Sequence, residues 1–323
     1  MSPATLLFLL LPPLMWASNA VVGRLSVSGG EPLVSPFLLN GLRWAMTLLL
    51  LALVAVMLRG PGPVDAAGRQ AGAGDGQASG PGASGLAAAW RRDWRAYLVL
   101  GLLSVTAYNS LQYLALRSTT AINVTLIGSS APLWMLVLGR VLWGERGHGR
   151  AWLGAAVSFG GVLVVLTGGD PQRLLALRLS PGDLLMLGAT VSWSLYSWLL
   201  RRIRPAASAL SFLILQTAAG LVLSVPVVGA EWGAGGLGLT WGWPTLAVVL
   251  WVALGPSLLA YWCWDRGIAR AGALLPIFFA NLTPLFAALM SAALLGEPPR
   301  WHHGLAFVLI AGGIALAQRP ARS

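Results

Sequence analysis

One stretch of this sequence has a similar counterpart further along the chain. Residues 131–161 align with residues 283–313 without a gap, at a constant offset of 152 positions (284 − 132). Pro132 aligns with Pro284, and each copy continues through a Gly-Glu pair that joins two apolar runs. A repeat carried by apolar segments predicts a chain built from two copies of one helical unit.

The apolar runs are too extensive for a soluble protein. Hydrophobic residues make up 57% of the 323-residue chain and charged residues 10%, with a mean hydropathy of +0.74. A soluble domain lacks the polar surface to cover so much apolar material, and continuous apolar runs of about 17 to 25 residues cross a bilayer as helices. We therefore expect an all-α integral membrane protein with ten transmembrane helices, near residues 4–23, 34–58, 96–116, 121–142, 151–168, 183–200, 207–228, 244–264, 272–294 and 303–318.

Towards the N-terminus the repeat continues at a different offset. Trp16 and Arg24 align with Trp193 and Arg201 at an offset of 177 (193 − 16), which is 25 more than 152 (177 − 152). An insertion of that size within residues 60–89 accounts for the difference. This stretch is rich in glycine, proline, alanine and serine, so we expect it to be a disordered loop.

The insertion allows the chain to be divided into two units of the same design. Residues 1–168 are expected to form a first five-helix repeat and residues 169–323 a second one. Because five is odd, the second copy enters the membrane in the opposite orientation, which makes an inverted repeat. Two such units in one chain suggest that a monomer suffices.

All 21 basic residues are arginines, and their placement predicts which end faces the cytoplasm. Fifteen fall in loops and flanks on the side of the N-terminus, five fall on the other side, and Arg43 lies inside an expected span. The positive-inside rule then places both termini in the cytoplasm and the chain in the cell (inner) membrane. Nucleic-acid binding is not expected, because the arginines lie between apolar runs and not on one soluble face. The run at 4–23 is interpreted as a span and not as a signal peptide, because no basic residue precedes it.

Short motifs stand along both halves, and the second half keeps the early part of the pattern less well. They are Trp16-Ala17-Ser18-Asn19, Pro36 with Arg43, Gly144-Glu145-Arg146, Gly160-Gly161, Gly182-Asp183 with Trp193, Ala280-Asn281-Leu282-Thr283-Pro284, Gly296-Glu297-Pro298 and Gly312-Gly313. In these features the chain resembles the EamA family of the drug/metabolite transporter superfamily. The resemblance implies an inverted-repeat carrier, often an exporter of amino acids, other metabolites or toxic compounds, and it leaves the substrate open.

Arg43 is the strongest candidate for a functional side chain. It lies about ten residues into the second expected span, where a charge is costly unless it faces a polar cavity or a partner. Its functional interpretation is an anchor for a substrate carboxylate, or a charge that must be neutralised before the carrier changes sides. The structural alternative is a guanidinium that caps backbone carbonyls at a broken helix.

Pro132 and Pro284 lie about eleven residues into the fourth and ninth expected spans, where we expect helix breaks. A proline removes a backbone donor and frees a carbonyl one turn earlier. Carriers with internal repeats place their sites beside such breaks. The nearby Asn123, Ser129 and Asn281 are therefore candidate substrate contacts, or alternatively they satisfy the freed carbonyls.

A second set of candidates combines aromatic and amide side chains inside the expected spans. Aromatic walls with a few polar groups suit an amphiphilic solute, whereas packing against lipid or other helices is the alternative for each aromatic. The set consists of Trp16, Asn19, Tyr108, Asn109, Gln112, Trp193, Tyr196, Tyr261 and Trp262.

Several functions lack the residues that they require. None of the ten acidic residues falls in the middle of an expected span, which disfavours proton coupling through a membrane-buried carboxylate and favours neutral or zwitterionic solutes. The sequence has no Walker-type motif for ATP, no usable metal-ligand spacing and no catalytic constellation, so we expect no cofactor, no metal and no enzymatic activity. Glu145 and Glu297 are expected to stabilise turns or to pair with neighbouring arginines.

These inferences predict a secondary transporter that exports a small neutral or zwitterionic metabolite, such as an amino acid, across the lipid bilayer by alternating access. Two alternatives stay open. One is an importer or exchanger of another solute, and the other is a membrane partner protein that transports nothing.

Overall fold

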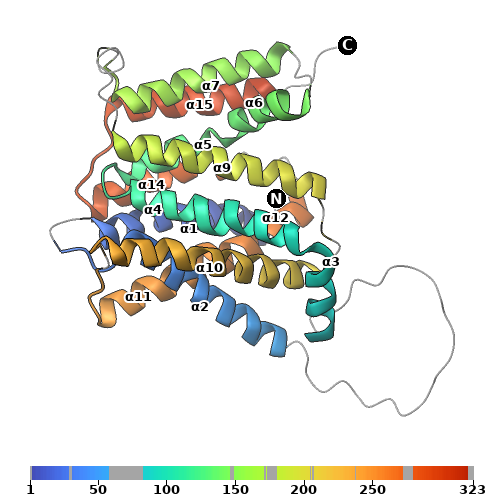
Figure 1. Ribbon diagram of the computed structural model, residues 1–323. Helices are drawn as coiled ribbons and strands as arrows, with labels where there is room; N and C mark the ends of the chain where they lie inside the picture. Colours follow the sequence, from blue (N-terminus) through green and yellow to red (C-terminus); the bar gives the residue numbers. More distant parts are fainter. Residues whose placement is uncertain are drawn as a thin grey trace.

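The computed structural model of the chain is a bundle of helices (Figure 1). It describes residues 2–28, 31–57, 83–145, 149–170, 172, 180–203, 205, 207–236, 238–271 and 279–318. The helical elements are α1 (Pro3–Val27), α2 (Pro36–Met57), α3 (Ala83–Gly101), the π-helix η1 (Leu102–Tyr108), α4 (Asn109–Ala115), α5 (Ala121–Ser129), α6 (Ala131–Trp143), α7 (Gly149–Thr167), α9 (Pro181–Ile203), α10 (Ala209–Gly233), α11 (Trp243–Val252), the π-helix η2 (Ala253–Leu259), α12 (Ala260–Ala271), α14 (Thr283–Leu294) and α15 (Trp301–Gln318).

Six of the described helical segments are long and apolar enough to cross a bilayer, and the bent pair α5–α6 would make a seventh. The six are Pro3–Val27, Pro36–Met57, Gly85–Ala115, Gly149–Thr167, Ala209–Gly233 and Trp243–Trp264. The chain is therefore an all-helical, multi-pass membrane protein. The remaining expected spans correspond to α9, α14 and α15. Of these, α14 and α15 count only as shorter apolar helices.

The helix α9 falls outside that group although it has 23 residues. It carries polar side chains, among them Asp183, Thr190 and Ser194, which are all buried. These side chains lower its apolar character, and they are tolerated because they face other helices and not lipid.

The stretch expected to be a disordered loop, residues 60–89, is only partly described. Residues 60–82 lie outside the described residues, and from Ala83 onward the chain is helical. The loop prediction was therefore wrong for residues 83–89. Four of the seven residues there are alanines, which have the highest helix propensity.

The helices pack in pairs that are far apart in the sequence. The helix α7 packs along α15, α1 contacts α12 and α14, α9 contacts α6, and α10 contacts α2 and α3. Figure 1 shows α6, α7 and α15 together at one side of the bundle, with α2, α10 and α11 at the other.

Glycine permits the close approach of α7 and α15. A Cβ atom added to Gly313 would lie 2.4 Å from the carbonyl oxygen of Gly154 and 2.3 Å from the Ser158 hydroxyl. No side chain fits at those distances, so the two backbones come together as they do at small-residue interfaces in membranes.

Both prolines of the repeat lie at the start of a helix. After Ser130 the chain bends by 42° between α5 and α6, and Pro132 lies in the first turn of α6. Pro284 lies in the first turn of α14, directly after a turn at 281–282. A proline at this position sacrifices no helical hydrogen bond, because the first N–H groups of a helix have no partner within it.

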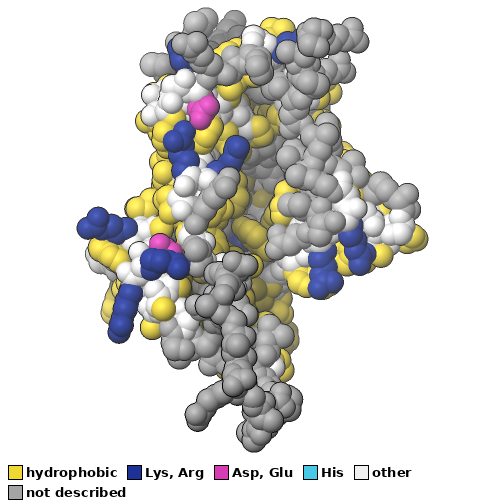
Figure 2. Space-filling view, turned by 90° about the vertical axis from the view of Figure 1, so that its right-hand side faces the viewer, with side chains coloured by type: hydrophobic (Ala, Val, Ile, Leu, Met, Phe, Trp, Pro, Cys, Tyr) yellow, Lys and Arg dark blue, Asp and Glu magenta, His cyan; other side chains and the backbone are white. Residues whose placement is uncertain are grey.

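Figure 2 looks onto one end of the bundle, the right-hand end in Figure 1, and shows arginine side chains spread over it. Two side-chain contacts connect segments at this end. Arg270 lies over the ring of Phe8, which joins the end of α12 to the start of α1. Arg202 contacts Glu145, which joins the end of α9 to the turn after α6.

Candidate functional site

Arg43 forms the centre of a polar cluster inside the bundle. It lies in α2 and only 4% of its surface is exposed. Its Nε donates to Ser257 Oγ at 2.8 Å, and its Nη1 donates to Asn109 Oδ1 at 2.8 Å, Tyr113 OH at 3.1 Å and Asn19 Oδ1 at 3.3 Å. Four elements, α1, α2, α4 and η2, therefore meet at one guanidinium.

The partners of Arg43 are also bonded to one another. The Tyr113 hydroxyl donates to Asn19 Oδ1 at 2.8 Å, and Asn19 Nδ2 lies 3.4 Å from Gln112 Oε1. Each group thus turns an oxygen toward the guanidinium and uses its own hydrogens elsewhere. The network fixes the position of Arg43 before any solute arrives.

Two of the four partners lie within or directly after a π-helix. Ser257 lies within η2 and its hydroxyl donates to the Val252 carbonyl at 2.9 Å. Asn109 directly follows η1, and its Nδ2 donates to the Ser104 carbonyl at 2.7 Å. A π-turn leaves carbonyls that side chains can satisfy, and such turns are frequent at functional sites. The two π-helices also stand at nearly the same repeat position, 151 residues apart (253 − 102).

The charge of Arg43 is not matched by any of these four groups. Ser257, Asn109, Tyr113 and Asn19 are all neutral, and the four bonds use Nε and Nη1 but not Nη2. Neutral dipoles reduce the cost of burying a cation, yet they do not cancel its charge as a carboxylate would. The site is therefore chemically suited to receive a carboxylate or another group rich in acceptors.

Two groups of aromatic side chains accompany the polar cluster. Tyr108 and Tyr196 both pack on Trp193, with ring centroids 5.1 and 5.0 Å apart. In the second group Trp16 packs against Tyr261 at 6.3 Å and Trp264 at 5.3 Å. The rings belong to α1, α9, α12 and η1.

Four of the expected site residues lie away from this cluster. Trp262 is 48% exposed and packs on Phe8 at the surface. Ser129 bonds the carbonyl of Thr125 in its own helix, at 2.8 Å. Asn281 stands in the turn before α14. The fourth, Asn123, belongs to a different cluster, which is described below.

The sequence analysis missed Tyr113 and Ser257. Tyr113 stands four residues after Asn109, so both lie on one face of a helix and Tyr113 was recoverable from helical spacing. Ser257 follows Pro256 within a run that reads as an ordinary apolar span. Its orientation depends on the π-helix, for which the sequence carries no clear signal.

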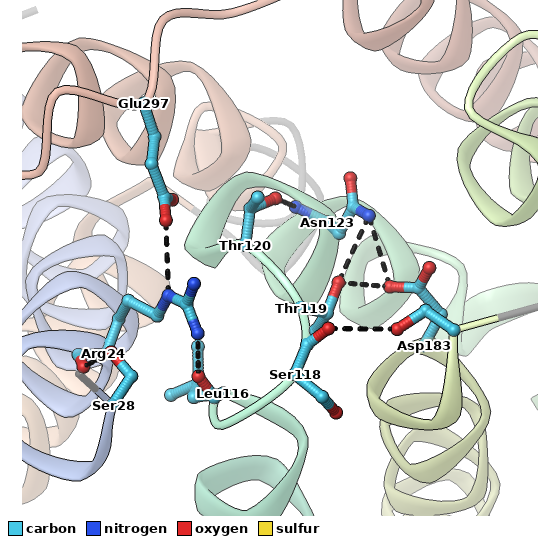
Figure 3. Close-up of polar contacts among 10 residues, drawn as sticks. Arg24, Ser28, Leu116, Ser118, Thr119, Thr120, Asn123, Asp183 and Glu297 are labelled. Carbon is cyan, nitrogen blue, oxygen red and sulfur yellow. Dashed lines mark hydrogen bonds and ion pairs between the residues drawn. The ribbon is translucent and has the colours of Figure 1, made fainter. Parts of the chain in front are cut away.

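A second polar cluster lies at the opposite end of the bundle from the face in Figure 2, and it is drawn in Figure 3. Asp183 is 2% exposed and accepts hydrogen bonds from the Thr119 hydroxyl and, at 3.1 Å, from Asn123 Nδ2. Asp183 lies in the first turn of α9. This cluster therefore ties α9 to the segment that enters α5.

An ion pair stands beside that cluster. Arg24, in the last turn of α1, directs its Nε to Glu297 Oε1 at 3.2 Å and its Nη1 to the Leu116 carbonyl (Figure 3). At the other end Arg202 Nη2 lies 3.1 Å from Glu145 Oε1. Both Gly-Glu turns therefore pair with arginines. Gly144 and Gly296, which precede the glutamates, both have a positive φ, 67° and 64°, which glycine adopts readily.

Among the described residues no group of three or more His, Cys, Asp or Glu side chains could hold a metal ion. The polar groups of the Arg43 cluster suit a solute better than a metal, because their centre is a cation.

Comparison with protein families matches the EamA-like transporter family at two places, residues 83–167 and 180–318. The uncharacterized transporter YyaM of Bacillus subtilis is 28% identical over 235 residues, which cover 70% of this chain and 74% of that protein. The aromatic amino acid exporter YddG of Ancylobacter novellus is 28% identical over 240 residues, which cover 72% of this chain and 78% of that protein.

One solved structure aligns with 98% of this chain and 98% of its own, with a TM-score of 0.57 and 22% sequence identity. Identity at that level indicates a shared fold and says nothing of the solute.

Proposed function

We propose that this chain, which belongs to the EamA-like transporter family, is a secondary carrier that exports a small neutral or zwitterionic metabolite, such as an amino acid, by alternating access. Membership of the family makes it a membrane transporter and not an enzyme. The observation that carries the finer proposal is the buried guanidinium of Arg43 with four neutral partners.

A zwitterionic solute fits this guanidinium for an energetic reason. A carboxylate that enters a dry site gives up water, and a charge-assisted bond to Arg43 offsets that loss. When the solute leaves, the oxygens of Asn19, Asn109 and Tyr113 still stabilise the cation. The carrier can therefore return empty without exposing a bare buried charge, as repeated transport requires.

The aromatic groups suit the other end of such a solute. Tyr108 directly precedes Asn109, and Trp16 lies three residues before Asn19 in α1. An aromatic or aliphatic side chain of a solute can pack on such rings. The similarity to a relative named as an aromatic amino acid exporter supports this choice of solute. The proposed contacts are Trp16, Asn19, Arg43, Tyr108, Asn109, Gln112, Trp193, Tyr196 and Tyr261, with Ser257 and Tyr113 added.

We further propose that the chain is a ten-helix inverted repeat of two five-helix units. Contacts between helices support this proposal. The repeat relates α1 to α9 and α14 to α6, and the contact of α1 with α14 has its counterpart in the contact of α9 with α6. The matching positions of η1 and η2 support it as well. The concentration of arginines in Figure 2 supports an orientation with both termini in the cytoplasm and the chain in the cell membrane.

The test compares amino acids with their carboxamides in proteoliposomes. Initial rates of saturable flux would be measured for aromatic and aliphatic amino acids and for the matching amides, with and without a pH gradient, in the wild type and in Arg43→Gln. A charged hydrogen bond contributes about 1.5–3 kcal/mol, so the wild type should prefer the acid over the amide by roughly 10- to 100-fold. Arg43→Gln should lose that preference.

The matched control is Arg92→Gln, which removes an exposed arginine on α3 and should keep the preference. An unchanged preference in Arg43→Gln would assign Arg43 a structural role only. Saturable uptake without efflux would favour import or exchange of a solute. Absence of saturable flux for every solute in the panel would count against an amino acid substrate and favour the non-transporting partner.

A further inference from the structure

Two ion pairs connect distant parts of the chain, one at each end of the bundle. Arg24 Nε lies 3.2 Å from Glu297 Oε1, and Arg202 Nη2 lies 3.1 Å from Glu145 Oε1. The first joins the end of α1 to the turn between α14 and α15. The second joins the end of α9 to the turn after α6.

The internal repeat relates these two pairs to each other. Glu145 and Glu297 are 152 residues apart (297 − 145), and both follow a glycine with positive φ. Arg24 aligns with Arg201, which is the neighbour of Arg202. Each ion pair therefore links the first helix of one copy to the Gly-Glu turn of the other copy.

The two pairs face opposite ends of the bundle. In Figure 1, α9 ends on the right, where Arg202 lies, and the α14–α15 turn, which holds Glu297, lies on the left. Between the two ends lies the buried Arg43 cluster.

The two pairs differ in burial. The side chains of Arg24 and Glu297 are 21% and 23% exposed, whereas those of Arg202 and Glu145 are 44% and 52% exposed. Arg24 also donates to the Leu116 carbonyl, which adds the end of α4 to the same contact. Exposed pairs contribute little because water competes for both charges. The Arg24 end is therefore held more firmly than the Arg202 end.

We infer that the two ion pairs are the alternating gates of the carrier, both formed in this structure, with the Arg24–Glu297 pair largely buried and the Arg202–Glu145 pair exposed to water. Opening of the Arg24 end separates the α14–α15 turn from α1 and α4. Because the repeat relates the two ends, Arg202 and Glu145 then become buried at the opposite end. Because each pair joins the two copies, one rocking motion breaks one pair while it tightens the other. The inference rests on the proposed function, since gates have meaning only for a carrier.

The test measures the two ends directly and needs no solute. Pairs of spin labels would be placed at Ser118 and Pro299 for the Arg24 end, and at Leu142 and Ile203 for the Arg202 end. All four positions are exposed, and Cys263, the single cysteine, is replaced by serine. Distances would be measured by pulsed EPR in lipid nanodiscs for the wild type, Arg24→Gln, Glu297→Gln and Arg202→Gln.

Arg24→Gln and Glu297→Gln should both lengthen the Ser118–Pro299 distance and shorten the Leu142–Ile203 distance, because both remove the same closed pair. Arg202→Gln should leave both distances near those of the wild type. The matched control is Arg92→Gln. It breaks the 3.0 Å pair with the neighbouring Asp93 within α3 and should change neither distance.

Wild-type distances in Glu297→Gln, in protein that remains monodisperse, would overturn the inference. Glu297→Gln keeps the size of the side chain, so it also serves if Arg24→Gln fails to fold. Movement at the Arg24 end without the opposite change at the Arg202 end would equally overturn the coupling. Shifted distances in a protein without flux would sustain the gates and count against the proposed solute, so the two proposals fail separately.

Discussion

Arg24 and Arg43 belong to the same helical bundle but are stabilised in different ways. Arg24 stands near the end of α1, partly exposed, with the Glu297 carboxylate 3.2 Å away. Arg43 stands in α2, 4% exposed, with four neutral hydrogen-bond partners. The more deeply buried arginine is thus the one whose charge these partners leave uncancelled.

This difference separates a structural charge from a charge available to a ligand. A carboxylate that belongs to the chain holds two segments together and leaves little for a solute to bind. Neutral oxygens hold the Arg43 guanidinium in place and leave its charge able to pair with the carboxylate of a solute. The comparison can be tested by exchanging these environments.

The largest effect is expected when Arg43 receives a carboxylate of its own. Ser257→Asp places an acid beside Nε, as Glu297 stands beside Arg24. The built-in carboxylate competes with that of the solute, so the flux of amino acids in proteoliposomes should fall roughly 10- to 100-fold.

The control for this change is Ser257→Asn, which has nearly the same size without the charge. It should retain most of the flux. Equal rates in the Asp and Asn variants would show that the charge of Arg43 is not what the solute uses.

A smaller effect is expected when Arg24 loses its carboxylate. Glu297→Gln removes a partly exposed ion pair, which contributes about 0.5–1 kcal/mol. In a chain of this size the thermal midpoint in detergent should fall by about 2 °C. The comparison variant is Glu31→Gln, an exposed carboxylate ahead of α2, which should leave the midpoint unchanged. A midpoint for Glu297→Gln equal to that of Glu31→Gln would mean that the pair adds no stability.

The smallest effect is expected at the exposed pair. Arg202→Gln breaks an ion pair in which both side chains are about half exposed. The Trp143 and Trp198 rings, on which the Arg202 guanidinium packs, are left unchanged. The thermal midpoint in detergent should fall by less than it does in Glu297→Gln. A fall as large as that in Glu297→Gln would show that the two pairs stabilise this state equally and that burial does not distinguish them.

The sequence was informative wherever the signal was local. Apolar length located α1, α2, α7 and α10, because a helix in lipid must satisfy its backbone within one segment. The apolar run around Arg43 also singled out this residue, since a charged side chain within a membrane span is costly. Helical spacing around Asn109 could have identified Tyr113 as well.

Other features needed the assembled bundle. Asp183 reads as an ordinary acid at a helix start, yet it is 2% exposed because the segment before α5 covers it. Trp262 reads as a wall of the site, yet it faces outward, 48% exposed. The rotation of a helix about its axis decides which side chains face inward, and this rotation cannot be predicted from the composition of the helix.

What the sequence determined by itself was a repeated set of apolar helices, with one charge in an apolar run and a glutamate after glycine in each copy. Only the tertiary structure decided that Ser257 from η2 meets Arg43, and that each Gly-Glu turn pairs with an arginine from a helix distant in the sequence. The physical reason is that burial and backbone bonding act within a segment, whereas contacts between helices depend on how distant segments cross and turn. A π-helix holds an extra residue in its turn, so it rotates the side chains that follow about the helix axis without any change in composition.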